Sequence, residues 1–408
     1  MNILDLQTVR PLIQFIYIFL RRKEMNNFTY HIPTKIHFGK GKISHLCELK
    51  ESGKRVLLVY GGGSIKREGI YDKAMEILKE NDLEVFEISG VEPNPRIETV
   101  RKGVELCKKE SIDMVLAIGG GSSIDCAKVI AAGAKYEADA WELVLNPKLI
   151  EGALPVYSVL TLAATGSEMD AFAVISDLTK NEKWGTFSTH LVPKMSVMDP
   201  EYTFSVPAKH TAAGTADIMS HTLENYFTNV KGGFMQARFC EGILKTLIHY
   251  GPIALKEPDN YEARANLMWA SSFAINGLLK LGSEVTWCVH PMEHELSAFY
   301  DITHGEGLAI LTPFWMEHAL NEDTAYKFAE YGRNVFGITG DDDMAVGKEA
   351  IAKTREFFAE MGLPATLKEV GIDDTYFAEM AAKAVKRAKG SFVPLTEEDM
   401  ISIYKAAL

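Results

Sequence analysis

Between about residues 54 and 200, short apolar runs alternate with amphipathic stretches. The runs "RVLLVY", "LEVFEIS" and "DMVLAIGGG" predict strands, whereas "YDKAMEILKEN", "RIETVRKGVELCKKES" and "SSIDCAKVIAAGAKY" predict helices. Strands that alternate with helices are typical of a parallel sheet with helices on both faces. This part of the chain is therefore predicted to be an α/β domain.

The strand pattern ends after "VMDPEYTFSVPAKHT", and from about Ala208 the pattern is helical to the C-terminus. "EARANLMWASSFAINGLL", "VGKEAIAKTREFFAEMG" and "EEDMISIYKAAL" show the spacing of helices, with breaks at glycine and proline. We expect an α/β domain over residues 25–203 and an all-helical domain over residues 204–408. Residues 1–24 precede Met25, which opens a natural domain start, so we interpret them as an upstream extension or a mis-chosen start, with a membrane-surface anchor as the alternative.

Length and charge narrow the possible partners. A chain of 408 residues can form two domains with cores of their own. The net charge is -12 and there is no block of lysine and arginine, which argues against a nucleic-acid partner. Leu12–Leu20 is far shorter than the roughly 20 apolar residues of a spanning helix, so no membrane partner is predicted. Five widely spaced cysteines without a C-x-x-C fit a reducing cytoplasm better than a disulfide framework.

Two glycine clusters each follow a predicted strand. In "VLAIGGGSSIDCAK" the cluster leads into a helix, where glycines allow the backbone to approach a diphosphate and the helix end attracts its charge. A tight strand-to-helix turn is the alternative, because the segment does not match G-x-G-x-x-G. In the earlier cluster, "LLVYGGGSIK", no acid is available to a ribose 2′-hydroxyl. Ser64 and Lys66 therefore favour NADP(H) over NAD(H), unless Lys66 is only a solvated surface charge.

Asp217 and His221 lie four apart in a helical pattern, so both side chains fall on one face. His290 and His294 have the same spacing, in a stretch where Pro291 is tolerated only in a first turn. His304 follows ten residues later. One carboxylate with two or three imidazoles suits Zn, Fe(II), Co or Mn, and the pattern does not choose among them.

Two other functions are compatible with parts of this pattern. "HPMEH", residues 290–294, matches the H-x-x-E-H of inverted zinc peptidases, in which Glu293 would be the general base. That hypothesis leaves His304 and the glycine loops without a role. A non-catalytic nucleotide-binding protein would explain the loops but not the histidines.

Taken together, these residues resemble the iron-containing, or group III, alcohol dehydrogenases, in particular their butanol dehydrogenase and broad aldehyde reductase branch. From about Thr29 to the C-terminus the family's segments occur in order: "PTKIHFGKGKI", "YGGGSIK", "GVEPNP", "AIGGGSSIDCAK", "LPVYSVLTLAATGSE", "DIMSHTLENY" and "HELSAFYDITHGEGLAI". The resemblance implies a dinucleotide domain, a helical domain, and an active site in the cleft between them. It also implies a homodimer or a larger assembly.

The resemblance further implies residue roles. The metal ligands would be Asp217, His221, His290 and His304, and His294 would stand near the metal as part of the proton path. The residues that would contact the cofactor lie in the glycine loops and nearby: Gly61, Gly62 and Ser64 at the adenosine end, Asn94 at a ribose or phosphate, Gly119, Gly120, Gly121 and Ser122 at the pyrophosphate, and Thr161, Thr165 and Lys183 at the nicotinamide.

The implied reaction is the reversible, NAD(P)H-dependent reduction of a short-chain aldehyde to a primary alcohol, with Fe2+ or Zn2+ as Lewis acid. Asp170 departs from the small neutral residue expected beside the nicotinamide, and an acid there would disfavour anionic substrates. The candidates for an apolar substrate pocket, with an ordinary helical core as the alternative, are Met268, Trp269, Phe273 and Trp287.

Overall fold

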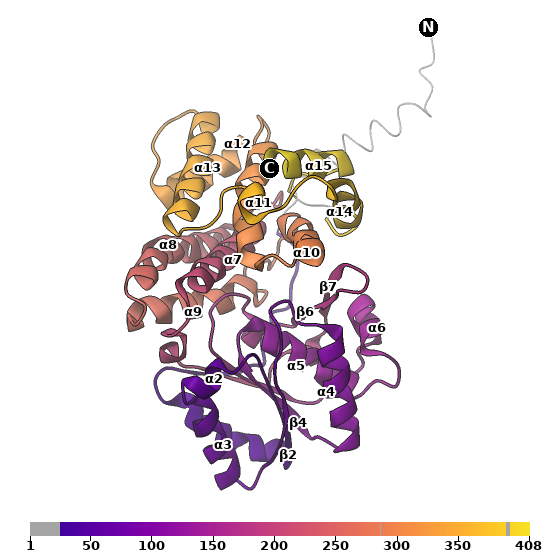
Figure 1. Ribbon diagram of the computed structural model, residues 1–408. Coiled ribbons are helices and arrows are strands. Elements are labelled where there is room, and N and C mark those ends of the chain that lie inside the picture. The colour runs from indigo at the N-terminus through magenta and orange to yellow at the C-terminus, as the bar shows by residue number, and fades with distance from the viewer. Residues whose placement is uncertain (1–24, 286, 389–391) are drawn as a thin grey trace.

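The computed structural model describes residues 25–285, 287–388 and 392–408. An α/β part lies at one end of the molecule and a helical part at the other (Figure 1). The predicted extension, residues 1–24, lies outside the described residues. Among the residues that are described, no helix is long and apolar enough to cross a membrane.

The α/β part contains one parallel sheet in the order β1-β8-β5-β4-β2-β3. Its strands are β1 (Lys35–Phe38), β2 (Arg55–Tyr60), β3 (Glu84–Ile88), β4 (Met114–Gly119), β5 (Val156–Leu160) and β8 (Met195–Met198). Its helices are α2 (Ser64–Arg67), α3 (Ile70–Glu80), α4 (Ile97–Lys109), α5 (Gly121–Gly133) and α6 (Ala140–Leu145), with the 3-10 segment η1 (Lys42–Ser52). The predicted fold class is confirmed.

Helices cover both faces because strand residues alternate between them. In β2, Leu57 and Val59 pack into the core beneath α4 and α5, whereas Val56 and Leu58 pack against α3 and η1. In the sheet, β3 lies on one side of β2 and β4 lies on its other side, so the strand order reverses at β2. At such a reversal the ends of neighbouring strands open a crevice, and ligands of α/β proteins bind there. The two glycine clusters follow β2 and β4, so the topology brings them together.

One antiparallel hairpin interrupts the parallel pattern. Strands β6 (Phe172–Asp177) and β7 (Glu182–Phe187) pair with each other and lie on the side of the α/β part that faces the helices (Figure 1). The strand and helix periods in the sequence gave no indication of this hairpin. It supplies one wall of the pocket described below.

The helical part consists of α7 (Ala208–Tyr226), α8 (Phe234–Lys256), α9 (Tyr261–Ile275), α10 (Val289–Tyr300), α11 (His304–Ala319), α12 (Ala325–Tyr331), α13 (Asp343–Glu360), α14 (Phe377–Ala384) and α15 (Glu397–Ala406). A π-helical turn, Gly332–Phe336, follows α12. Helix α7 is buried from Thr211 to Tyr226, because α8, α9 and α11 pack around it. A helix buried on all sides is a rigid support for polar residues that point into a site.

Candidate metal centre and dinucleotide cleft

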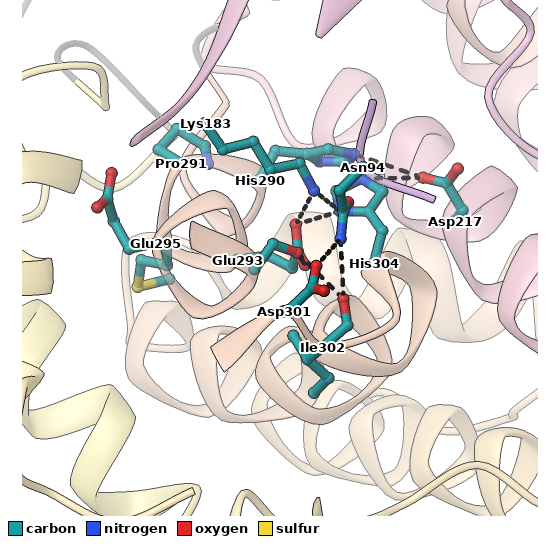
Figure 2. Close-up of polar contacts among 12 residues, drawn as sticks. Asn94, Lys183, Asp217, His290, Pro291, Glu293, Glu295, Asp301, Ile302 and His304 are labelled. Carbon is teal, nitrogen blue, oxygen red and sulfur yellow. Dashed lines mark hydrogen bonds and ion pairs between the residues drawn. The ribbon is translucent and has the colours of Figure 1, made fainter. Parts of the chain in front are cut away.

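Four predicted ligands converge from three helices. Asp217 and His221 project from one face of α7, His290 lies in the first turn of α10, and His304 is the first residue of α11. The Nε2 atoms of His221, His290 and His304 lie 3.4, 3.6 and 3.6 Å from Oδ1 of Asp217. Figure 2 shows His290 and His304 with Asp217 in this arrangement. Residues 87 positions apart in the sequence therefore meet within one small volume.

Two glutamates hold the histidines from behind. Nδ1 of His290 is hydrogen-bonded to Oε2 of Glu224 on α7, and Nδ1 of His304 is hydrogen-bonded to Oε2 of Glu293 on α10. Glu224 also accepts the backbone N–H groups of Cys288 and Val289, and so satisfies the start of α10. A carboxylate that binds one imidazole nitrogen fixes the ring with its other nitrogen toward a metal.

The electrostatics of the buried cluster match this arrangement. Burial disfavours a charged ring, but Glu224 and Asp217 outweigh it and raise the pKa of His290 to about 9. Burial lowers the pKa of His221 to about 4. Burial also opposes a charged Asp217, yet the surrounding histidines hold its pKa far below the ordinary value. A buried carboxylate that stays charged among imidazoles is a ready ligand for a cation.

The donor set fits a divalent metal ion. Oδ1 of Asp217 and Nε2 of His290 are buried but have no hydrogen-bond partner among the described residues, which is costly unless something else binds them. Tetrahedral ligands at about 2.0–2.2 Å from a metal are about 3.3–3.6 Å from each other. The 3.4–3.6 Å spacing around Asp217 agrees with that value. Three imidazoles and a carboxylate suit Zn2+ or Fe2+ alike.

His294 lies beside this cluster. Its ring centroid is 6.3 Å from that of His290 and 5.6 Å from that of His304. Burial, followed by the charge of Lys183, lowers its pKa well below the ordinary value. The ring is therefore neutral at pH 7, with one N–H donor and one acceptor nitrogen, so it can donate a proton from one nitrogen while it accepts another at the second.

The peptidase hypothesis does not fit these contacts. The carboxylate of Glu293 is fully buried and is bound to Ser297 and to the Nδ1 atom of His304, behind the metal centre. A general base must reach the water that it activates. Glu293 instead orients His304, a role that the sequence pattern did not reveal.

A cleft of about 860 Å³ runs from the glycine loops to the metal centre. It touches Asp217 and His304 at one end and α2 at the other. Of the residues predicted for the cofactor, those that line it are Gly62, Ser64, Asn94, Gly120, Gly121, Ser122, Thr161 and Thr165. Gly121 is required where it is, because a Cβ atom there would lie 2.2 Å from Oγ1 of Thr165.

Four of the predicted cofactor residues do not line this cleft. Gly119 is the last residue of β4 and Gly61 directly follows β2. Lys183 lines the neighbouring pocket, where its Nζ is 3.5 Å from Oε2 of Glu293 and 3.4 Å from Nδ1 of His304. Lys66 points away from the cleft, as described below. Asn94 has a left-handed backbone (φ 53°), and its side-chain amide donates to Asp301 and to the backbone of Ile302 (Figure 2).

A second pocket of about 410 Å³ adjoins the cleft at the metal centre. Its apolar wall consists of Phe172, Val174, Trp184, Phe187, Ile275 and Trp287. Trp287 is one of the pocket residues considered from the sequence. Met268 belongs to the α/β core, whereas Trp269 is 42% exposed and packs edge-on against Phe38 and Phe273. The hairpin β6–β7 thus supplies much of the apolar pocket wall that was expected from residues of the helical part.

Asp170 also lines this pocket, but its charge is balanced. Nζ of Lys128, which is fully buried, donates to Oδ1 of Asp170 (2.6 Å) and to the backbone oxygens of Asp170 (3.1 Å) and Phe172 (2.8 Å). The expectation that Asp170 would repel anionic substrates is therefore weakened, because an ion pair presents little net charge. Lys128 and Asp170 instead fix the turn that places Phe172.

Comparison with known proteins agrees with this architecture. Residues 33–200 match the family profile "Iron-containing alcohol dehydrogenase", and residues 211–408 match "Fe-containing alcohol dehydrogenase family, C-terminal". The chain belongs to the iron-containing alcohol dehydrogenase family. This confirms the resemblance drawn from the sequence segments.

Relatives within the iron-containing alcohol dehydrogenase family cover nearly the whole chain. NADH-dependent butanol dehydrogenase A of Clostridium acetobutylicum is 58% identical over 386 residues, 93% of this chain and 99% of that protein. The NADPH-dependent aldehyde reductase YqhD of Escherichia coli is 43% identical over 364 residues, 88% of this chain and 93% of that protein. The crystal structure of NADH-dependent butanol dehydrogenase A from Thermotoga maritima superposes with a TM-score of 0.90 at 39% identity, covering 94% of this chain and 99% of the other.

Proposed function

We propose that this enzyme interconverts short-chain aldehydes and primary alcohols with a nicotinamide cofactor and a divalent metal ion. The observation that supports the proposal most strongly is the position of the Asp217 and histidine cluster. It lies where the dinucleotide cleft meets the apolar pocket, and Asn94, Ser122 and Thr165 line both cavities. A cofactor and a small apolar substrate would therefore meet at the metal centre.

Asp217, His221, His290 and His304 would hold the metal. When bound, the ion supplies a Lewis acid that polarises a carbonyl group. Glu224 and Glu293 orient two of the imidazoles, and the packing of α7, α10 and α11 holds all four side chains before any ligand arrives. The protein's contribution is thus a site that needs little rearrangement during the reaction.

The remaining residues align the reactants and exclude water. The loops at Gly62 and at Gly120–Ser122 would bind the cofactor backbone, and Thr161 and Thr165 would place the nicotinamide toward the metal centre. The aromatic wall from Phe172 to Trp287 would hold an aliphatic chain and keep the site dry during hydride transfer.

Proton transfer is assigned to His294. Because the ring is neutral, it would accept a proton from water at one nitrogen while it donates from the other toward the substrate oxygen. We expect His294→Ala to lower kcat while metal content stays at the wild-type level. His294→Gln, which retains a hydrogen-bonding group, should lose less activity than His294→Ala.

Several finer points belong to the same proposal. Residues 25–203 and 204–408 would be two domains that close on the cofactor. The protein would be cytoplasmic, and its subunits would form a homodimer. Size-exclusion chromatography with light scattering tests the oligomeric state. Fe2+ and Zn2+ both suit the ligand set, and both NADH and NADPH are candidates, since relatives that use each are closely similar in sequence.

The decisive experiment follows absorbance at the nicotinamide band with butyraldehyde and either NADH or NADPH, using anaerobically purified protein. Activity should be lost with a chelator and regained with Fe2+ or Zn2+. Asp217→Asn should bind cofactor but contain little metal and be inactive. A non-catalytic nucleotide-binding protein would bind cofactor equally well in the wild type and the variant, with no turnover in either. That result would overturn the proposal.

A further inference from the structure

The adenosine end of the cleft carries two charged side chains that the glycine-loop pattern did not single out. Arg67 and Glu68 line the cleft beside Ser64 and Gly62. Helical spacing explains this placement, because Ser64, Arg67 and Glu68 stand at positions i, i+3 and i+4 along α2 and its C-cap. Lys66 stands at i+2, on another side of the same turn.

Lys66 is already engaged away from the cleft. Its Nζ lies 4.3 Å from the ring centroid of Tyr71 and 5.0 Å from that of Tyr60, and 4.0 Å from Oε2 of Glu87. Glu87 also accepts the hydroxyls of Tyr60 (2.7 Å) and Tyr71 (2.5 Å). These contacts draw Lys66 toward Tyr60, Tyr71 and Glu87, and it does not line the cleft.

Arg67 is different. Within the described part of the chain its guanidinium has neither an ion pair nor a side-chain hydrogen bond, and the same holds for the carboxylate of Glu68. The other arginine of the cleft, Arg96, is bound through Nη2 to both carboxylate oxygens of Asp301 at 2.9 Å. Arg67 is thus the unengaged arginine of the cleft, next to an unengaged acid.

We infer that Arg67 and Glu68 together read the 2′ position of the adenosine ribose, with Arg67 binding the phosphate of NADPH and Glu68 the hydroxyl of NADH. A guanidinium is the side chain best matched to a phosphate, and a carboxylate accepts from a ribose hydroxyl. Side by side, the pair admits both cofactors and excludes neither. This inference rests on the proposed function, since it assigns the cofactor of that same cleft.

The test measures the Kd of NADPH and of NADH by nucleotide fluorescence with the whole protein. Arg67→Ala should weaken NADPH about 10- to 100-fold and change NADH less than about threefold. Glu68→Gln should weaken NADH about three- to tenfold and leave NADPH equal or tighter. Arg67→Lys should retain part of the NADPH affinity, because the charge remains but the planar fork is lost.

Two further variants separate this inference from a general charge effect. Lys79→Ala removes an exposed cation of α3 and is the matched control, expected within about twofold of wild type for both cofactors. Lys66→Ala should behave like that control. The inference is overturned if Lys66→Ala weakens NADPH as much as Arg67→Ala does, or if Arg67→Ala weakens both cofactors equally. Wild-type protein that binds as predicted but turns over no aldehyde would refute the proposed function alone.

Discussion

The contact between α11 and α7 at Gly305 sets the geometry of the metal centre. A Cβ atom at Gly305 would lie 1.9 Å from the backbone oxygen of Ala213, whereas real Cβ contacts are essentially never below 3.0 Å. In Gly305→Ala the helices must therefore separate by the difference, about 1.1 Å. Ala213 lies one helical turn before Asp217, and Gly305 follows His304, so the separation acts directly on the two ligands.

The expected magnitude follows from this displacement. Metal–ligand distances tolerate only about 0.2 Å, so a shift of about 1.1 Å should lower metal affinity by at least the 10- to 100-fold typical of a disturbed supporting contact. Overpacking costs about 1–3 kcal/mol. For a domain of about 200 residues each kcal/mol lowers Tm by about 2–4 °C, so the expected decrease is roughly 2–12 °C. Metal content by mass spectrometry and Tm by calorimetry measure the two effects.

A matched glycine supplies the control. Gly242 lies on the exposed face of α8, and a Cβ atom there would meet nothing within 4 Å. Gly242→Ala should leave metal content unchanged and raise stability by about 0.5–1 kcal/mol, because alanine favours the helix. The reasoning is refuted if Gly305→Ala retains both the metal content and the Tm of the wild type.

Three other perturbations test separate parts of the molecule. Glu224→Gln weakens the support of His290 and should lower metal affinity about 10- to 100-fold, measured by competition with a chelator. Burial raises the pKa of Glu168 in the folded protein to about 7, whereas the ordinary value in the unfolded chain is 4.5. The free energy of unfolding is therefore highest below pH 4.5 and decreases as pH rises toward 7, because the carboxyl group ionises first in the unfolded chain. Glu168→Gln should therefore stabilise the protein at pH 8 by about 2–4 kcal/mol and not at pH 4, and equal Tm differences at both pH values would contradict this. Lys128→Met leaves Asp170 buried without its partner and should cost about 3–5 kcal/mol; a denaturant titration showing less than 1 kcal/mol would refute the buried-pair argument.

Local patterns in the sequence were sufficient to predict the parallel sheet and the helical part, but not the β6–β7 hairpin. Short apolar runs followed by amphipathic helices predict a parallel sheet, because strands covered by helices on both faces are apolar along their whole length. The i,i+4 spacing of Asp217 and His221 predicts one shared helix face, and Pro291 predicts the first turn of α10, where the structure has it. These statements concern neighbours along the chain, for which backbone geometry alone fixes the relative direction of side chains.

Contacts between elements were decided only by the tertiary structure. Glu224 and Glu293 each stand three residues after a predicted ligand histidine, yet each supports a histidine of a different helix, His290 and His304. The sequence predicted that Lys66 faces a cofactor phosphate; in the structure Lys66 lies over Tyr71 and near Glu87, whereas Arg67 lines the cleft. Spacing in a sequence gives the direction of a side chain on its own element; the packing of that element decides what the side chain meets.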